Sequence, residues 1–124
     1  MKHILLVDDN ETFCRSLAEI LRRAGYEVRT AAEGSAALRL FREEPADLVI
    51  TDLIMPGKEG LETIIELRQI RSSVRIIAIS GGGRIDPGDY LPMAQQLGAN
   101  RTLAKPFTSE QILDLVGESF AESN

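Results

Sequence analysis

The sequence predicts an α/β fold, a five-stranded parallel sheet that is doubly wound, with helices on both faces. Three observations support this architecture. Short apolar runs rich in β-branched residues, such as Leu48–Ile50, are typical of strands buried on both faces. Between them lie longer stretches whose apolar residues recur at helical spacing. Strand and helix alternate five times along the chain, which favours a parallel sheet with right-handed helical crossovers.

Turn and capping residues delimit the predicted elements. Strands are expected at Ile4–Val7, Tyr26–Thr30, Leu48–Asp52, Val74–Ile79 and Arg101–Ala104, the last of them at a sheet edge. Helices are expected from the N-cap Asn10 to the closing Gly25, around Ala36–Phe41, over Leu61–Ile70, around Tyr90–Leu97, and from Thr108 to Phe120. Thr108 and Gln111 fit the capping-box pattern. Residues 81–88 are the most turn-prone segment.

Composition narrows the function classes. The chain has 124 residues, of which 44% are hydrophobic, and its net charge of −5 argues against gripping nucleic acid through phosphates. No apolar run approaches the ~20 residues of a membrane span, and the N-terminus lacks a signal-peptide pattern. The single cysteine, Cys14, cannot form an internal disulfide, which fits a reducing compartment. We therefore expect one cytoplasmic domain over residues 1–124, with neither nucleic acid nor membrane as a direct partner.

Asp52 is the residue around which the chain is organised. It ends the buried strand Leu48–Asp52, and Pro56 and Gly57 then turn the chain away. A carboxylate in that position is costly unless a group outside the strand compensates it. Ligands of open parallel sheets bind in the crevice beyond the carboxyl ends of the strands. Asp52 is therefore a metal ligand or a reactive group, with a buried salt-bridge anchor as the structural alternative.

Other polar groups follow the neighbouring strands. The first strand ends in Asp8 and Asp9, the fourth in Ser80, and the fifth runs into Lys105. A parallel sheet brings these ends to one edge, where three carboxylates need a cation to stay ionised together. Hard oxygen ligands favour Mg²⁺. A carboxylate can also accept a phosphoryl group, whose charge a metal, a lysine and a hydroxyl would stabilise.

Four motifs resemble those of the receiver domain of two-component response regulators, a family that includes the single-domain chemotaxis regulator. They are Leu6–Asn10, Asp52–Pro56 with Gly60, Ser80–Gly81 and Lys105–Phe107, in the family's order. They span nearly the whole chain, and their combination is far more specific than any single motif. The resemblance implies a flavodoxin-like fold and a single receiver domain over residues 1–124.

The resemblance also assigns a role to each acidic residue. Asp52 would be the phospho-acceptor, taking its phosphoryl group from a sensor histidine kinase or a phosphotransfer protein. Asp9 would bind Mg²⁺ directly and Asp8 through a water molecule. An oxygen of Asp52 and the backbone carbonyl of Ile54 would complete the protein ligands. Such a domain catalyses only its own phosphorylation and dephosphorylation, so it is not an enzyme in the usual sense.

The remaining implied roles concern the phosphoryl group and the partners. Ser80 would donate a hydrogen bond to one phosphoryl oxygen, and Lys105 would pair with another. The peptide bond before Pro106 is expected to be cis. The downstream partner would be an effector protein or an output domain, and a phosphorylation-dependent homodimer stays open.

The sequence departs from the family pattern at two places. Thr102 stands three residues before the lysine, where the family usually has an aromatic switch residue, so the usual aromatic movement is not expected. The segment between Ser80 and Lys105 is also longer than usual, and Tyr90 within it is a candidate substitute for the missing ring. Near the acceptor, apolar Ile54 is expected to hinder the hydrolytic water.

Two other functions stay open at this point. A degenerate receiver would act as a phosphorylation-independent interaction module, and Thr102 favours that alternative. An Asp-nucleophile phosphohydrolase would also combine carboxylates, Mg²⁺ and a lysine on an α/β sheet. Such enzymes carry the nucleophile and the acid on the first strand, one residue apart, whereas Asp8 and Asp9 are adjacent here.

Overall fold

A computed structural model describes residues 2–53, 60–80, 94–96 and 98–121 of the chain. Within these residues, five strands form one parallel sheet in the spatial order β2-β1-β3-β4-β5. The strands are β1 (His3–Val7), β2 (Glu27–Ala31), β3 (Leu48–Asp52), β4 (Arg75–Ser80) and β5 (Arg101–Ala104). The predicted five-stranded parallel sheet is confirmed, and β5 lies at an edge as expected.

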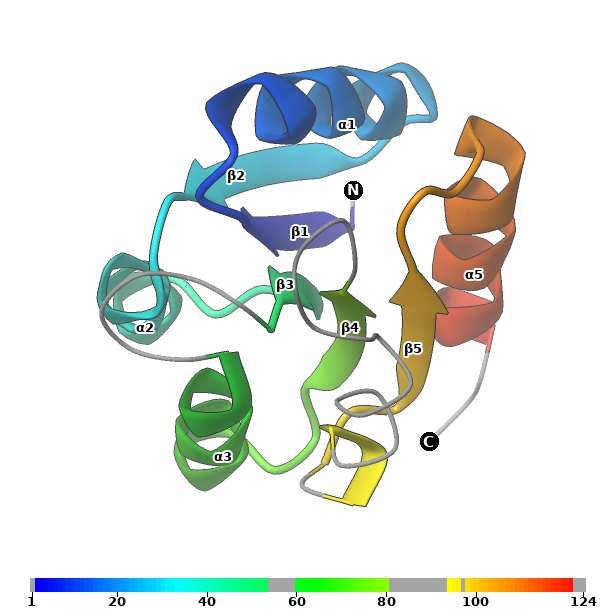
Figure 1. Ribbon diagram of the computed structural model, residues 1–124. Helices are drawn as coiled ribbons and strands as arrows, with labels where there is room; N and C mark the ends of the chain where they lie inside the picture. The colour runs from blue at the N-terminus through cyan, green and yellow to red at the C-terminus, as the bar shows by residue number, and fades with distance from the viewer. Residues whose placement is uncertain (1, 54–59, 81–93, 97, 122–124) are drawn as a thin grey trace.

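Helices cover both faces of the sheet, as predicted (Figure 1). The long helices are α1 (Glu11–Arg23), α2 (Gly34–Glu43), α3 (Gly60–Ile70) and α5 (Ser109–Ala121). Helices α1 and α5 share one hydrophobic cluster with one face of the sheet, and α2 and α3 share the other. Residues 94–96 are also helical, and the rest of the helix expected at Tyr90–Leu97 lies outside the described residues.

Strand β3 shows why an unbroken apolar run is typical of a strand that is buried on both faces of the sheet. Leu48 and Ile50 pack in the cluster of α1 and α5, whereas Val49 and Leu53 pack in the cluster of α2 and α3. All four side chains are at most 2% exposed. Each such side chain contributes roughly 1.5–3 kcal/mol when it is fully buried. Burial on both faces therefore holds β3, and with it Asp52, in a fixed position.

The capping residues act as the sequence predicts. The Asn10 side chain accepts a hydrogen bond from the Phe13 N–H at 3.0 Å and caps α1. Gly25, at φ 102°, closes the same helix. In α5, the Thr108 N–H donates to Gln111 Oε1 at 2.8 Å, and the Gln111 N–H donates to Thr108 Oγ1 at 3.1 Å. This reciprocal pair is the expected capping box.

Two strands begin one residue later than predicted, and both delays follow from backbone hydrogen bonds. The Tyr26 N–H donates to the Leu21 carbonyl at 3.2 Å, so it belongs to the end of α1 and β2 begins at Glu27. The Val74 N–H donates to the Arg71 carbonyl at 3.2 Å in a turn, and β4 begins at Arg75. Local hydrogen bonds thus compete with the sheet for these N–H groups.

In the described part of the chain, no helix combines the length and the apolar character that crossing a membrane would require.

Candidate functional site

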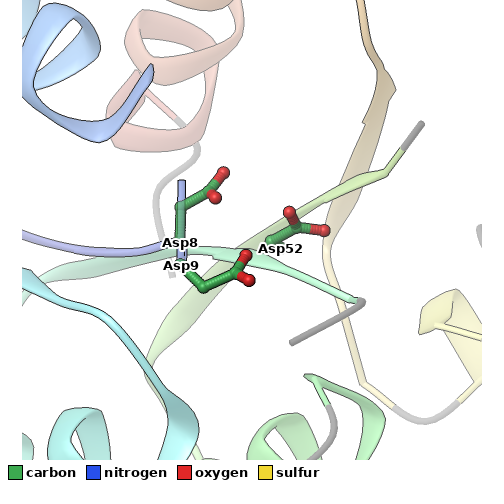
Figure 2. Close-up of side chains that lie close together, drawn as sticks. All are labelled: Asp8, Asp9 and Asp52. Carbon is green, nitrogen blue, oxygen red and sulfur yellow. The ribbon is translucent and has the colours of Figure 1, made fainter. Parts of the chain in front are cut away.

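The acidic residues meet at the carboxyl ends of β1 and β3. These strands are neighbours, and Val7 pairs with Thr51, so Asp8 and Asp52 follow at the same level. Carboxylate oxygens of Asp8, Asp9 and Asp52 lie within 4.8 Å of one another (Figure 2). Asp8 is 2% exposed and Asp52 6%, whereas Asp9 is exposed to solvent. Two carboxylates are thus buried in the site, and the third opens it to solvent.

Lys105 supplies the cation of the site. Its Nζ lies 2.8 Å from Asp8 Oδ2 and 3.1 Å from Asp52 Oδ2. The Lys105 N–H donates to the Ser80 carbonyl at 2.7 Å, so the residue is held at the end of β4 as well as after β5. The peptide bond between Lys105 and Pro106 is cis, as the resemblance implies.

The electrostatics of the site keep this lysine charged. Burial favours the neutral form of the Lys105 side chain, but the hydrogen bond to Asp8 and the charges of Asp52 and Asp8 more than offset it, so the pKa of Lys105 is raised. One ammonium faces three carboxylates, which leaves the site with a net negative charge. This net negative charge favours the binding of a further cation.

Ser80 adds a buried hydroxyl at the end of β4. It follows Ile79, which pairs with Asp52 across β3 and β4, so it lies at the same edge of the sheet. Ser80 is 0% exposed, and among the described residues no group forms a hydrogen bond with its Oγ. A buried hydroxyl without a partner costs about 1–3 kcal/mol. Such a group calls for an explanation, and an acceptor oxygen that arrives with a ligand would supply one.

Gly60 brings the start of α3 against the end of β3. Its N–H donates to the Leu53 carbonyl at 3.1 Å. A Cβ at Gly60 would lie 2.5 Å from Leu53 Cα and against the carbonyl oxygen of Asp52. Only a residue without a side chain fits there, which explains why this position carries one of the family's glycines.

A sequence-family model described as the response regulator receiver domain matches residues 4–117. The chain belongs to this family. The predicted resemblance is thereby confirmed.

Known relatives of this receiver domain differ in length. Sporulation initiation phosphotransferase F of Bacillus subtilis is 34% identical over 113 residues, which make up 91% of this chain and 89% of that protein. Transcriptional regulatory protein CpxR of Klebsiella pneumoniae is also 34% identical over 113 residues, but these are only 47% of its length. The chain thus spans most of the first relative and about half of the second.

Solved structures confirm the flavodoxin-like form of the receiver fold. A response regulator receiver domain protein from Clostridium thermocellum superposes with a TM-score of 0.88 at 30% identity, covering 96% of this chain and 94% of that one. A CheY-like receiver domain protein from Methanospirillum hungatei reaches 0.87 at 27% identity, covering 95% and 92% of the two chains.

Two features of this receiver domain were not anticipated as parts of the site. The Phe13 ring lies over Lys105, with Nζ 4.1 Å from its centroid. The Asn10 N–H donates to Asp8 Oδ1 at 2.9 Å and orients that carboxylate. Both residues lie within the first turn after the acidic pair, and that proximity was the signal available in the sequence.

Of the residues that depart from the family pattern, the structure describes Thr102 but not Tyr90. Thr102 lies half-buried in β5, where it pairs with Ala78 of β4. Ile54, expected to offer a carbonyl to the metal, and Tyr90, the candidate substitute for the switch residue, lie outside the described residues. Their roles stay predictions.

Proposed function

We propose that phosphorylation of Asp52 switches this receiver domain, and that the donor is a phosphohistidine of a sensor kinase or phosphotransfer protein. The observation that carries the proposal is the Lys105 ammonium, 3.1 Å from Asp52 Oδ2, at the edge of the sheet where β4 ends in Ser80, whose buried hydroxyl has no hydrogen-bond partner among the described residues. An ammonium and a hydroxyl at the same edge of the sheet as the Asp52 carboxylate suit the oxygens of a phosphoryl group.

The chemistry assigns one role to each residue. An oxygen of Asp52 forms the new bond to phosphorus while the phosphorus–nitrogen bond of the donor breaks, and the released imidazole takes its proton from solvent. Lys105 moves its hydrogen bond from the Asp52 carboxylate to one phosphoryl oxygen. The hydroxyl of Ser80 donates to another and gains an acceptor, which it has from none of the described residues.

The donor set fits Mg²⁺. Three carboxylates with oxygens within 4.8 Å of one another, of which one is exposed, match a hard cation that keeps several waters. Asp9 and Asp52 would bind it directly, Asp8 would hold it through a water, and the Ile54 carbonyl would complete the set. When bound, the ion neutralises charge, so that an anionic phosphoryl donor can approach Asp52.

The partners follow from the same proposal. The relatives include a protein named DNA-binding transcriptional regulator NtrC, from Azospirillum brasilense, of which the matching region is 23%. We therefore propose that the phosphorylated domain controls an output domain or a separate effector protein. A cytoplasmic location and a phosphorylation-dependent homodimer remain predictions of the same kind.

A phosphorylation-independent interaction module is the second candidate function. The observation that favours it is Thr102, which supplies no aromatic ring from β5. In that case the acidic cluster would be a structural remnant, and the protein would bind its partner equally well with Asp52 unmodified.

Intact-protein mass spectrometry after incubation with acetyl phosphate tests the proposal. We expect one phosphoryl adduct that requires Mg²⁺ and is absent from Asp52→Asn. Asp114→Asn is the matched control, because Asp114 lies exposed on α5 and should leave the adduct unchanged. Absence of an adduct from the wild-type protein under every condition would overturn the proposal and favour the interaction module.

A further inference from the structure

We propose that Phe13 is a positioning residue for Lys105, whose ammonium it holds against the face of its ring throughout the phosphorylation cycle. The inference rests on the proposed function, since it assigns a role in the same reaction. It adds a neutral, aromatic partner to a cation whose ion pairs among the described residues are with two carboxylates, Asp8 and Asp52.

The geometry of the pair is that of a cation–π interaction. Nζ of Lys105 lies 4.1 Å from the ring centroid of Phe13, well inside the roughly 6 Å limit for such contacts. The Lys105 side chain is only 16% exposed. Since desolvation strengthens cation–π interactions, the attraction between Lys105 and Phe13 should be stronger than that of a cation–π pair on the surface.

Phe13 is held in place by a contact of its ring and by a hydrogen bond of its backbone. Phe107 packs edge-to-face on Phe13, with centroids 5.8 Å apart and an interplanar angle of 81°. Phe13 lies in the first turn of α1, and its backbone N–H donates to the capping Asn10 Oδ1. Lys105 and Phe107 flank Pro106 on one short loop, so this loop contacts the ring through a cation and through an aromatic edge.

The reaction explains why a neutral partner is useful. When the Asp52 carboxylate becomes an acyl phosphate, the ammonium must leave one carboxylate oxygen and pair with a phosphoryl oxygen. A carboxylate such as Asp8 competes for the N–H groups and neutralises the charge, whereas a ring face attracts the cation and carries no formal charge. Phe13 can therefore keep the ammonium in the site while its hydrogen-bond partners change.

A fluorination series at Phe13 tests this inference. One, two or three ring fluorines withdraw electron density from the ring face at nearly constant shape. The readout is the affinity for beryllium trifluoride, a phosphoryl mimic, in the presence of Mg²⁺. We expect the affinity to fall stepwise with fluorination and to fall by about 3- to 30-fold in Phe13→Leu.

Phe120 provides the matched control. Its ring also lies near a lysine, with Lys2 Nζ 5.5 Å from the centroid, but it packs on Tyr26 and does not contact Asp8 or Asp52. The same fluorinated residues at position 120 should leave the affinity unchanged. A second readout needs neither metal nor phosphoryl mimic, because the Phe13 ring current should shift the Lys105 ε-methylene proton signals upfield, and this shift should vanish in Phe13→Leu.

The outcomes separate this inference from the proposed function. A protein that binds the mimic with the same affinity across the Phe13 series overturns the inference alone. A protein that shows the ring-current shift but takes up neither phosphoryl group nor mimic overturns the proposed function and, with it, the role of Phe13 in the reaction. Stepwise weakening at Phe13, with no change at Phe120, supports both.

Discussion

Lys105 lies between two carboxylates and an aromatic ring, so its charge holds this edge of the sheet together. We expect Lys105→Met to lower the unfolding free energy by about 2 kcal/mol at neutral pH, because it leaves buried carboxylates without their cation. The value is below that of a fully enclosed pair, because the site opens to solvent at Asp9. Urea denaturation measures the change, with Lys2→Met at an exposed lysine as the control.

The pH dependence of this contribution has a defined sign. Since the pKa of Lys105 is raised in the folded protein, its stabilisation is complete below the unfolded-state value near 10.5 and is lost as the pH rises through the folded-state pKa. Wild type and Lys105→Met should therefore differ in stability by a constant amount at neutral pH and converge at strongly alkaline pH. A difference that disappears already below pH 10.5 would contradict this account.

Ser80 should show opposite effects on stability and on function. Because its buried Oγ lacks a partner among the described residues, Ser80→Ala should leave the unfolding free energy unchanged or raise it by up to about 1 kcal/mol. The same variant should bind beryllium trifluoride more weakly and lose its phosphoryl group at a changed rate. Ser119→Ala is the control, since that hydroxyl donates to the Leu115 carbonyl at 2.9 Å inside α5, away from the site. Equal effects of both variants on the mimic would argue against the proposed role.

At the scale of elements, the site depends on how closely α3 approaches β3. Gly60→Ala would force its Cβ against the backbone of Asp52 and Leu53, so one of the two elements must shift. We expect a loss of about 1–3 kcal/mol in unfolding free energy and slower phosphorylation, because Asp52 moves with the strand end.

Gly117→Ala in α5 is the matched control for this close approach. Apart from the adjoining backbone of α5, no atom of the described residues lies within 4 Å of a Cβ built there, and the residue is exposed. Alanine should therefore stabilise α5 by roughly 0.5–1 kcal/mol. Chemical denaturation of both variants, together with the rate of reaction with acetyl phosphate, measures the contrast. Similar unfolding free energies for the two variants would show that α3 can move away from β3 without loss of stability.

For the whole molecule, the proposed Mg²⁺ site would connect metal binding to folding. We expect Mg²⁺ at a hundred times its dissociation constant to stabilise the wild type by about 2.7 kcal/mol. Asp9→Asn should lose most of this gain, yet it should raise the metal-free melting temperature, because one of three clustered carboxylates is neutralised. Thermal unfolding with and without Mg²⁺ tests both signs, with Asp114→Asn as the control. A variant that lowers the metal-free melting temperature would show that Asp9 stabilises the fold by another route.

Much of the architecture follows from local signals in the chain. Unbroken apolar runs such as Leu48–Ile50 mark strands buried on both faces, and the caps Asn10, Gly25 and Thr108 act through neighbours only a few residues away. Strand limits are less predictable. Tyr26 belongs to the end of α1 because its N–H donates to the Leu21 carbonyl and not to a strand of the sheet.

From the sequence, one edge of the sheet is expected to carry Asp8, Asp9, Asp52, Ser80 and Lys105, because parallel strands place all their carboxyl ends on the same side. Which of these groups touch follows from the three-dimensional packing. Lys105 reaches two carboxylates and the face of Phe13, whereas the hydroxyl of Ser80 has no hydrogen-bond partner among the described residues. These contacts join segments far apart in the chain, so they depend on strand order, register and helix packing rather than on any local pattern.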